Sequence, residues 1–311
     1  MKYCFLLALL LNYFQGKPQD GKIIDQVPFE LPDSIKVRDA KYFDWQLLET
    51  VNFYHITYLS DGLKVKGYMS VPKQKGKYPC IIYNRGGNRE NAAISDYAFI
   101  ALLGYLSCSD YVVVASQYRG NAGGEGKEEF GGKDIDDVLN LFPLLNNVEY
   151  ADTSRIGMEG SSRGGMMTYL ALTKTNLIKA AVVISGIADF KQSIETGNFN
   201  ADSMFYSWLP EYRENKESFI KKRSPIEFAN NICRTTPLFI VQGTGDGRVT
   251  TPQVFDLAKK FYELKQPFRL SLFEGGGHNV REFKPEMEYQ IKTFFDYYLR
   301  DGKKWPSLEL H

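Results

Sequence analysis

Short, unbroken runs of hydrophobic residues alternate with longer amphipathic stretches along most of this chain. The hydrophobic runs lie at 79–84, 111–118, 154–160, 180–186, 237–243 and 268–275. The stretches that follow the helical period include 92–104, 133–146, 163–174, 252–265 and 286–300. This alternation indicates a mostly parallel β-sheet whose two faces are covered by helices. We therefore expect an α/β architecture with right-handed crossovers between the parallel strands.

Two further strands precede this region and have a different pattern. Hydrophobic and polar residues alternate in VNFYHITYL and in LKVKGYMSV, and Ser60-Asp61-Gly62 between them is a hairpin turn signal. With this hairpin, the sheet is expected to contain about eight strands. We place it in one domain over residues 51–302, after a polar and irregular N-terminal arm at 17–50 and before a C-terminal tail at 303–311.

One interval between predicted strands is too long for a simple crossover. About fifty residues, rich in aromatic side chains, separate Gly186 from Pro237. An insertion of this length is typically a lid or a substrate-binding element. We expect a helical lid insertion at about 190–230, with Phe205 and Trp208 as candidate substrate contacts. An extra helical pair with its own small core is the other interpretation, and the two are compatible.

Composition narrows the class of protein. The 311 residues are 43% hydrophobic and 24% charged, with a formal net charge of +1, which is ordinary for a globular chain. Basic and acidic residues are interspersed, so we expect no nucleic-acid partner. The four cysteines are scattered, and no cluster of histidines or acids has metal-ligand spacing. We therefore expect no metal and no cofactor, and the oligomeric state stays open.

The first sixteen residues have a pattern of their own. One lysine is followed by about a dozen mostly apolar residues before polarity returns. This stretch is too short to span a membrane, which needs about 20 residues, and it is typical of a signal-peptide core. We expect residues 1–16 to be a signal peptide, the protein to be secreted or periplasmic, and no stable membrane insertion. An uncleaved anchor or a buried helix is the alternative.

The segment Gly160-Ser161-Ser162-Arg163-Gly164 matches the pattern G-x-S-x-G, with Ser162 at its centre. In this motif a strained strand-to-helix turn lifts the serine hydroxyl above the sheet edge. A predicted strand precedes the motif and a predicted helix follows it, as the motif requires. Ser162 is therefore the candidate nucleophile, and Ser161 occupies the variable position.

A serine hydroxyl needs a base to act as a nucleophile, and that base is usually a histidine oriented by a carboxylate. His278, in FEGGGHNV, directly follows the last predicted strand, whereas His55 lies in the opening hairpin and His311 is the C-terminal residue. Asp246 follows the penultimate strand. The order Ser162, Asp246, His278 is the order of an α/β-hydrolase triad, with Asp189 as the rival acid.

Two backbone amides are expected to form the oxyanion hole. The N–H of Arg163 begins the helix after the nucleophile, where the helix dipole favours negative charge. The second donor is expected from the loop NRGGNRE after the strand at 79–84, through Gly86 or Gly87. A plain turn at the end of that strand is the alternative.

Five segments resemble, in order, the catalytic domain of the prolyl oligopeptidase family of serine peptidases. They are YNRGGN, QYRGNAGGEGKEEFGGKDIDDV, GSSRGGMM, RSPIEFANNICRTTPLFIVQGTGDGRV and FEGGGHNV, and the resemblance covers roughly residues 50–300. It implies an α/β-hydrolase fold with Ser162 as nucleophile, Asp246 as acid and His278 as base. It also supports Arg163 and the RGG loop as the oxyanion hole.

The chain departs from this family in two respects. Many members carry a β-propeller before the hydrolase domain, whereas here only about thirty residues separate the expected signal peptide from the first predicted strand, so we expect no propeller. Some members have a tyrosine at the first position of the oxyanion loop. This chain has Arg85 there, which makes Arg85 a candidate substrate contact.

The sequence therefore predicts a serine hydrolase that cleaves peptide or ester bonds through an acyl-enzyme. A peptidase acting on small peptides is the first reading, and a carboxylesterase is the alternative. A non-catalytic binding module on the same fold is a third hypothesis. It is disfavoured because all three residues of the triad are present.

Overall fold

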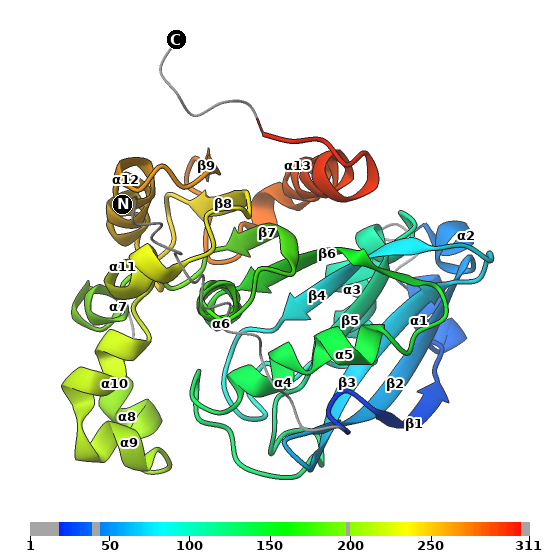
Figure 1. The fold of residues 1–311 in the computed structure, drawn as a ribbon, viewed down its shortest axis with the longest axis horizontal. Coiled ribbons are helices and arrows are strands. Elements are labelled where there is room, and N and C mark those ends of the chain that lie inside the picture. The colour runs from blue at the N-terminus through cyan, green and yellow to red at the C-terminus, as the bar shows by residue number, and fades with distance from the viewer. Residues whose placement is uncertain (1–18, 39–43, 197–199, 306–311) are drawn as a thin grey trace, which may run out of the picture.

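A nine-stranded twisted β-sheet runs through the computed structural model, which describes residues 19–38, 44–196 and 200–305 (Figure 1). The strand order is β1-β2-β3-β5-β4-β6-β7-β8-β9. β1, β2, β3 and β5 pair antiparallel, and β5, β4 and β6 to β9 pair parallel. The strands are β1 (Ile23–Pro28), β2 (Val51–Ser60), β3 (Leu63–Pro72), β4 (Tyr78–Asn84), β5 (Val112–Ser116), β6 (Ala151–Ser161), β7 (Ile178–Ile184), β8 (Leu238–Gly243) and β9 (Phe268–Phe273).

Each hydrophobic run and the opening hairpin form strands as predicted, but β1 was not foreseen. It lies in the segment expected to be an irregular arm, and it pairs antiparallel with β2, with Val27 opposite His55. β1 is an edge strand whose residues are mostly exposed, so it needs no alternation of hydrophobic and polar residues. Backbone hydrogen bonds to β2 hold β1 in the sheet, and the hydrophobic pattern of the sequence contains no signal for such pairing.

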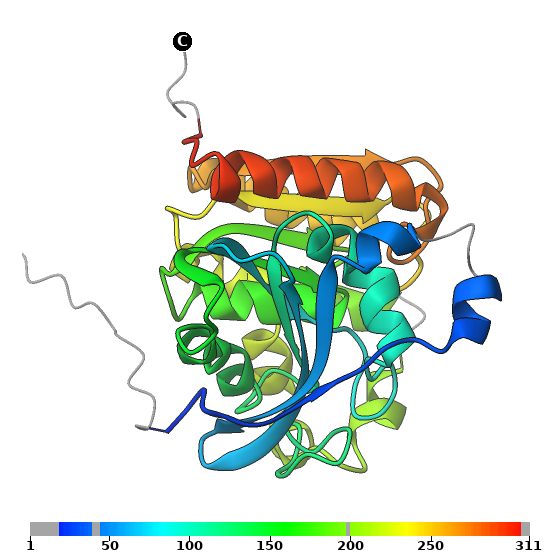
Figure 2. The ribbon, with the colours of Figure 1, turned by 90° about the vertical axis from the view of Figure 1, so that its right-hand side faces the viewer.

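Helices cover both faces of the sheet. α3 (Asp96–Ser107) and α13 (Lys284–Phe295) pack on one face. α4 (Ile135–Leu139), α5 (Leu141–Leu145), α6 (Arg163–Leu172) and α12 (Thr251–Glu263) pack on the other. In Figure 1, α4, α5 and α6 lie in front of the sheet and α3 lies behind it. Figure 2 shows α13 running beside β8, with β1 and β2 toward the viewer. Each face thus has its own hydrophobic core, and the sheet is buried between them.

The insertion between β7 and β8 is helical, as predicted, and lies at the lower left of Figure 1. Its helices are α7 (Phe190–Thr196), α8 (Ala201–Phe205), α9 (Pro210–Glu214), α10 (Lys216–Lys222) and α11 (Pro225–Phe228). The rings of Phe205, Tyr212 and Phe219 pack together, with centroids 5.2 to 5.6 Å apart. The insertion therefore has a small aromatic core of its own, which is the second of the two interpretations.

This core corrects one predicted substrate contact. Phe205 is fully buried and contacts Phe130 and Phe190 as well as its neighbours in the insertion. A side chain with no exposed surface holds the insertion together and is not available to a substrate. Met204, the residue before it, lines a cavity next to Ser162 instead.

The N-terminal segment expected to be a signal peptide, residues 1–16, lies outside the described residues. Within the described residues, no helix is both long enough and apolar enough to span a bilayer.

Candidate active site

β6, a tight turn and α6 position Ser162 at the carboxyl end of the parallel strands. Ser162 has φ 57° and ψ −122°, a strained conformation for a residue other than glycine. A Cβ on Gly164 would lie 1.8 Å from the carbonyl oxygen of Asn84, and a Cβ on Gly160 would lie 2.1 Å from that of Gly164. Only glycines fit at these two positions. The structure has the strand–turn–helix setting expected of G-x-S-x-G.

His278 joins Ser162 to Asp246. Its Nε2 lies 2.9 Å from the Ser162 Oγ, and its Nδ1 lies 2.8 Å from the Asp246 Oδ2. Asp246 follows β8 and His278 follows β9, so the ends of neighbouring parallel strands bring the two residues together. The side chain of Asp246 is fully buried and that of His278 is 14% exposed, so the imidazole faces solvent at one edge. This geometry permits proton transfer from the hydroxyl to the imidazole.

The rival candidates are engaged elsewhere. The Asp189 carboxylate accepts the backbone N–H groups of Lys191 and Gln192 at the start of α7. His55, on β2, lies 2.6 Å from Asp96 at the start of α3. Asp246 and His278, and not Asp189 and His55, therefore lie within hydrogen-bond distance of each other and of the nucleophile.

Asp246 stays ionised at neutral pH. Burial by itself would raise the pKa of its carboxyl group. The hydrogen bond and the charge of His278 outweigh burial, together with the backbone N–H groups of Arg248 and Val249, and the pKa of Asp246 falls below its ordinary value. A permanently charged carboxylate can hold one imidazole tautomer and stabilise the imidazolium form.

The two predicted oxyanion donors lie on either side of the nucleophile. Arg163 is the first residue of α6, and the first amides of a helix have no partner within that helix. The loop after β4 passes close to Ser162, because a Cβ on Gly86 would lie 3.2 Å from the Ser162 Cβ. Gly87 and Arg163 line the same cavity as Ser162. Both residues therefore border the space beside the nucleophile in which a substrate oxygen would lie.

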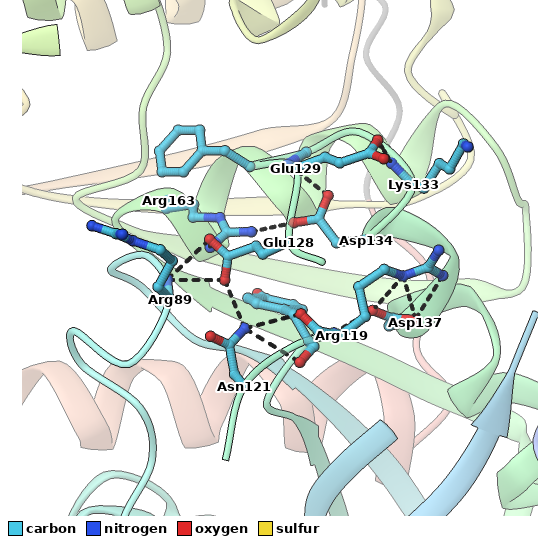
Figure 3. A network of polar contacts seen from close by, with 12 residues as sticks. Arg89, Arg119, Asn121, Glu128, Glu129, Lys133, Asp134, Asp137 and Arg163 are labelled. Atoms are coloured by element: carbon cyan, nitrogen blue, oxygen red, sulfur yellow. Dashed lines mark hydrogen bonds and ion pairs between the residues drawn. The ribbon is translucent and has the colours of Figure 1, made fainter. Parts of the chain in front are cut away.

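A buried ionic network fixes this loop against α6 (Figure 3). Arg163 pairs with Glu128 at 2.7 Å and with Asp134, and it donates to the Gly87 carbonyl oxygen at 3.0 Å. Both carboxylate oxygens of Glu128 also accept the backbone N–H of Arg89. The side chain of Arg163 therefore holds the loop, while its backbone directly follows the nucleophile.

Arg85 is part of the same network, although the sequence suggested that it contacts substrate. It is 1% exposed, and its guanidinium donates to the carbonyl oxygens of Gln117 and Arg89 and to Glu128. Its contacts hold the loop from inside, which gives it a positioning role, and it also lines the second of the two cavities that meet at Ser162. Trp208 is half-buried and packs against the Arg89 guanidinium, 5.0 Å from the ring centroid.

Sequence reasoning missed Glu128 and Asp134. They precede their partner Arg163 by more than 25 residues, at no characteristic spacing. It also missed the contact of Ser161, whose hydroxyl donates to Asn279 beside the histidine, at 2.6 Å. No local pattern reports such contacts, because the fold alone brings the partners together.

Two cavities meet at Ser162. The first, called here the apolar cavity, has a volume of about 280 Å³ and is lined by Gly87, Phe130, Ile187, Met204 and Val249 among others. The second, called here the polar cavity, has a volume of about 340 Å³. Its lining includes His278 and Tyr105, two acidic side chains and four basic ones: Glu159, Glu288, Arg85, Arg248, Arg281 and Lys284. Arg248 lines both cavities and is exposed at the border between them.

Among the described residues, no group of three or more histidine, cysteine or acidic side chains is arranged to hold a metal ion. The imidazole of His278 lies within hydrogen-bond distance of the Ser162 hydroxyl, which is the contact that acyl transfer by a serine nucleophile requires.

Comparison with known proteins agrees with this geometry. Residues 98–303 match the model of the prolyl oligopeptidase family. The uncharacterized peptidase YtmA of Bacillus subtilis (strain 168) is 30% identical over 218 residues, which cover 70% of this chain and 82% of YtmA. Longer curated relatives are matched over 38% of their length or less.

Solved structures share the fold. The acylaminoacyl peptidase of Pyrococcus horikoshii superposes with a TM-score of 0.69 at 22% identity, over 85% of this chain and 44% of that one. The esterase Pf2001 of Pyrococcus furiosus superposes with a TM-score of 0.62 at 19% identity, over 82% of this chain and 95% of that one. At these identities the likeness shows the α/β-hydrolase fold alone. The match to the family model decides the rest: the chain belongs to the prolyl oligopeptidase family and is a serine peptidase.

Proposed function

We propose that this peptidase hydrolyses small peptides with Ser162 as nucleophile, His278 as general base and acid, and Asp246 as the carboxylate that orients His278. One observation carries the proposal. A single imidazole contacts both the Ser162 hydroxyl, at 2.9 Å, and the buried Asp246 carboxylate, at 2.8 Å. Three residues far apart in the sequence are thereby placed in the order that proton transfer requires.

The acylation step follows from these contacts. His278 Nε2 takes the proton of the Ser162 hydroxyl while Oγ attacks the scissile carbonyl carbon, and the carbonyl oxygen becomes an oxyanion. The backbone N–H groups of Arg163 and Gly87 are the proposed donors to that oxyanion. The imidazolium then protonates the leaving amine, the C–N bond breaks, and the acyl group stays on Ser162.

Deacylation reverses the roles. Water enters where the amine left, His278 removes its proton, and the hydroxide attacks the ester carbonyl. The second tetrahedral intermediate collapses with return of the proton from His278 to Ser162. The Asp246 carboxylate stabilises the positive charge of the imidazolium in both steps.

The size of the two cavities supports small substrates. Volumes of about 280 and 340 Å³ lie near the lower end of the range for ligand pockets, roughly 300 to 1,000 Å³. Each cavity is of a size for one or two side chains, one on either side of Ser162. Short peptides with a bulky apolar group on the acyl side match the apolar cavity.

An ester-cleaving role is the second candidate. The observation that favours it is the superposition with an esterase of matching size, reported above. Matched substrates with one acyl group and either an amide or an ester leaving group distinguish the two. Hydrolysis of the ester alone would favour the esterase reading.

The chemical test uses a fluorophosphonate probe, which labels activated serines. We expect wild type to be labelled and Ser162→Ala to lose both the label and about 10⁴- to 10⁶-fold in kcat. Ser161→Ala is the matched control and should keep the label, because its hydroxyl contacts Asn279 and not His278. Equal labelling of wild type and Ser162→Ala, or no labelling of either, would favour a binding module over an enzyme.

A further inference from the structure

The two acidic side chains of the polar cavity leave no free negative charge in it. Glu288 is paired, because the Lys284 ammonium lies 3.4 Å from its carboxylate and also donates to the Ala101 carbonyl oxygen at 2.9 Å. Glu159 is 3% exposed, and burial raises its pKa to about 8; the hydrogen bond from Tyr105 opposes this rise and the charge of Glu288 adds to it. Glu159 is therefore neutral at neutral pH.

Arg85, one of the four basic side chains, is occupied on the inner side of the loop after β4. Its nitrogens donate to the carbonyl oxygens of Gln117, Gly86 and Arg89, at 2.8 to 3.1 Å. One of them also lies 3.4 Å from the Glu128 carboxylate. Each nitrogen of this guanidinium thus has an acceptor within the protein, so its role is to hold the loop.

Arg248 and Arg281 are the two basic side chains that remain. Both are exposed, and in the described part of the chain neither forms an ion pair. The nearest acids along the sequence are engaged otherwise: Asp246 contacts His278, and Glu282 accepts a backbone N–H at 3.2 Å. A guanidinium keeps its charge at every working pH, and its fork of N–H donors fits a carboxylate. Two unpaired positive charges therefore line the polar cavity.

The loops that carry the triad also carry these arginines. Arg248 follows Asp246 by two residues and lies at the border of the two cavities. Arg281 follows His278 by three residues, at the start of the 3-10 helix η2 (Arg281–Phe283), and of the two cavities it lines only the polar one. The positive charges are thus placed in the same cavity as the catalytic imidazole.

His278 shows which part of a substrate enters this cavity. In the described part of the chain, His278 lines the polar cavity and is absent from the lining of the apolar one. The imidazolium must protonate the leaving amine, so the leaving group lies on the side of His278. The apolar cavity then receives the acyl side, and the polar cavity receives the residue that follows the scissile bond.

A free carboxylate on that residue would lie close to the leaving nitrogen. Two covalent bonds join this nitrogen to the carboxyl carbon, which puts the carboxylate oxygens within about 4 Å of the atom that His278 protonates. A leaving group of two or more residues would place a neutral amide there. The lining also contains apolar side chains, Leu102 and Met287 among them, which offer a surface to the side chain of the leaving amino acid. The cavity therefore presents both kinds of surface that a single amino acid requires.

We propose that the polar cavity binds the free α-carboxylate of a single leaving amino acid, with Arg281 and Arg248 as its counter-charges. The substrate class is a short peptide whose last peptide bond is cleaved, so that its C-terminal amino acid is released. The inference rests on the function proposed above and adds a specificity to the same site.

The test compares peptides that share one acyl side and differ only in the leaving residue. Norleucine as the free acid, norleucine amide and glutamate amide present an α-carboxylate, no carboxylate and a side-chain carboxylate. Product release followed by liquid chromatography gives kcat/KM for each peptide. We expect wild type to prefer the norleucine acid over its amide by about tenfold, because the arginines offer charge-assisted hydrogen bonds at an exposed site.

The glutamate amide should be cleaved no faster than the norleucine amide. If wild type prefers the glutamate amide as strongly as the norleucine acid, the assignment to the α-carboxylate is wrong.

Arg281→Gln removes one of the two charges at an exposed position, where a substitution has little effect on stability. We expect this variant to cleave the norleucine amide as wild type does and the acid-to-amide ratio to fall by about threefold or more. The matched control is Arg234→Gln, at an exposed arginine before β8 that lines neither cavity, and it should keep the ratio of wild type. An unchanged ratio in Arg281→Gln overturns the inference.

The norleucine amide peptide separates this inference from the function on which it rests. Its hydrolysis without a preference for the acid contradicts the inference alone, whereas no hydrolysis of any of the three peptides contradicts the peptidase proposal. A second readout needs no turnover: norleucine should slow fluorophosphonate labelling of wild type more than norleucine amide does, and this difference should shrink in Arg281→Gln. Equal slowing of wild type by the two compounds would also overturn the inference.

Discussion

At the scale of single residues, the candidate site depends on side chains that support one another. Glu128 shows this dependence most clearly. Its carboxylate accepts from Arg85, Arg163 and the backbone of Arg89, which joins the loop after β4 to the start of α6. Burial alone would raise the pKa of Glu128. The charges of Arg163 and Arg85 outweigh burial and hold that pKa below its ordinary value, so the group is ionised in the folded protein.

Replacement of Glu128 by glutamine tests this residue. Two buried arginines would lose one of their counter-charges, and breaking a buried ion pair costs about 3–5 kcal/mol. We expect the free energy of unfolding to fall by that amount in urea titrations. We also expect kcat to fall more than KM changes, because the oxyanion donors act in the transition state. The control is Glu125→Gln, at an exposed residue of the loop between β5 and α4 that also contains Glu128. An unchanged kcat for folded Glu128→Gln would contradict the positioning role of Glu128.

At the scale of elements, function depends on how closely β4, β6 and α6 approach one another. α6 starts directly after Ser162, and its first turn lies against the end of β4, with Gly164 next to the Asn84 carbonyl. This close approach brings the oxyanion loop to the nucleophile. The strain at Ser162 is maintained because the elements on both sides of the turn are buried.

Gly164→Ala tests the close approach of these elements. The added Cβ would meet backbone atoms of β4 that cannot move without separating the elements. We expect a loss of several kcal/mol in the free energy of unfolding, on the order of the cost of overpacking, and lower activity in what remains folded. The control is Gly104→Ala in α3, where the Cβ would only contact Leu48 and Ile100 side chains at 3.4 Å or more.

Gly104→Ala should be neutral or stabilising by up to about 1 kcal/mol, because alanine favours a helix over glycine. Thermal melts of both variants and of wild type make the comparison. Similar melting temperatures for Gly164→Ala and Gly104→Ala would show that α6 can move away from β4.

At the scale of the whole molecule, buried acids of two kinds make stability depend on pH in opposite directions. Glu128 and Asp246 have lowered pKa values, so their contribution is present above the pKa of the unfolded chain and is lost as the pH falls. Glu159 has a raised pKa of about 8, so it is protonated in the folded protein up to that pH. Its contribution is fully present at low pH and is lost as the pH rises from the unfolded value, about 4.3, to about 8.

Glu159→Gln measures the second effect. Glutamine is neutral at every pH, so the variant should match wild type near pH 5 and exceed it at pH 9. The difference follows about 1.4 kcal/mol per pH unit, with an upper bound of about 5 kcal/mol. Urea titrations at the two pH values check this result. A variant that is less stable than wild type at pH 9 would show that the charged form of Glu159 is well accommodated in the folded protein.

The sequence predicted those residues of the candidate site that belong to local patterns, and it missed the roles that depend on remote contacts. Ser162, Asp246 and His278 were predicted because glycine-rich turns follow buried strands, and such turns are local patterns. Phe205 was misjudged because an aromatic residue in a long insertion has the same appearance whether it packs inward or faces a substrate. The positioning role of Arg85 was missed because its partners, such as Gln117, are remote in the sequence.

The sequence by itself determined the alternation of strands and helices, the strained turn at Ser162 and the chain order of the triad. All of these arise from interactions between residues close in sequence, namely side-chain periodicity and the steric demands of glycine turns. Only the tertiary structure decided that β1 joins the sheet and that Glu128 forms ion pairs with both Arg85 and Arg163. It also decided that Glu159 lines a cavity together with His278. Those outcomes depend on backbone pairing and on charges brought together across the fold, for which spacing along the chain contains no signal.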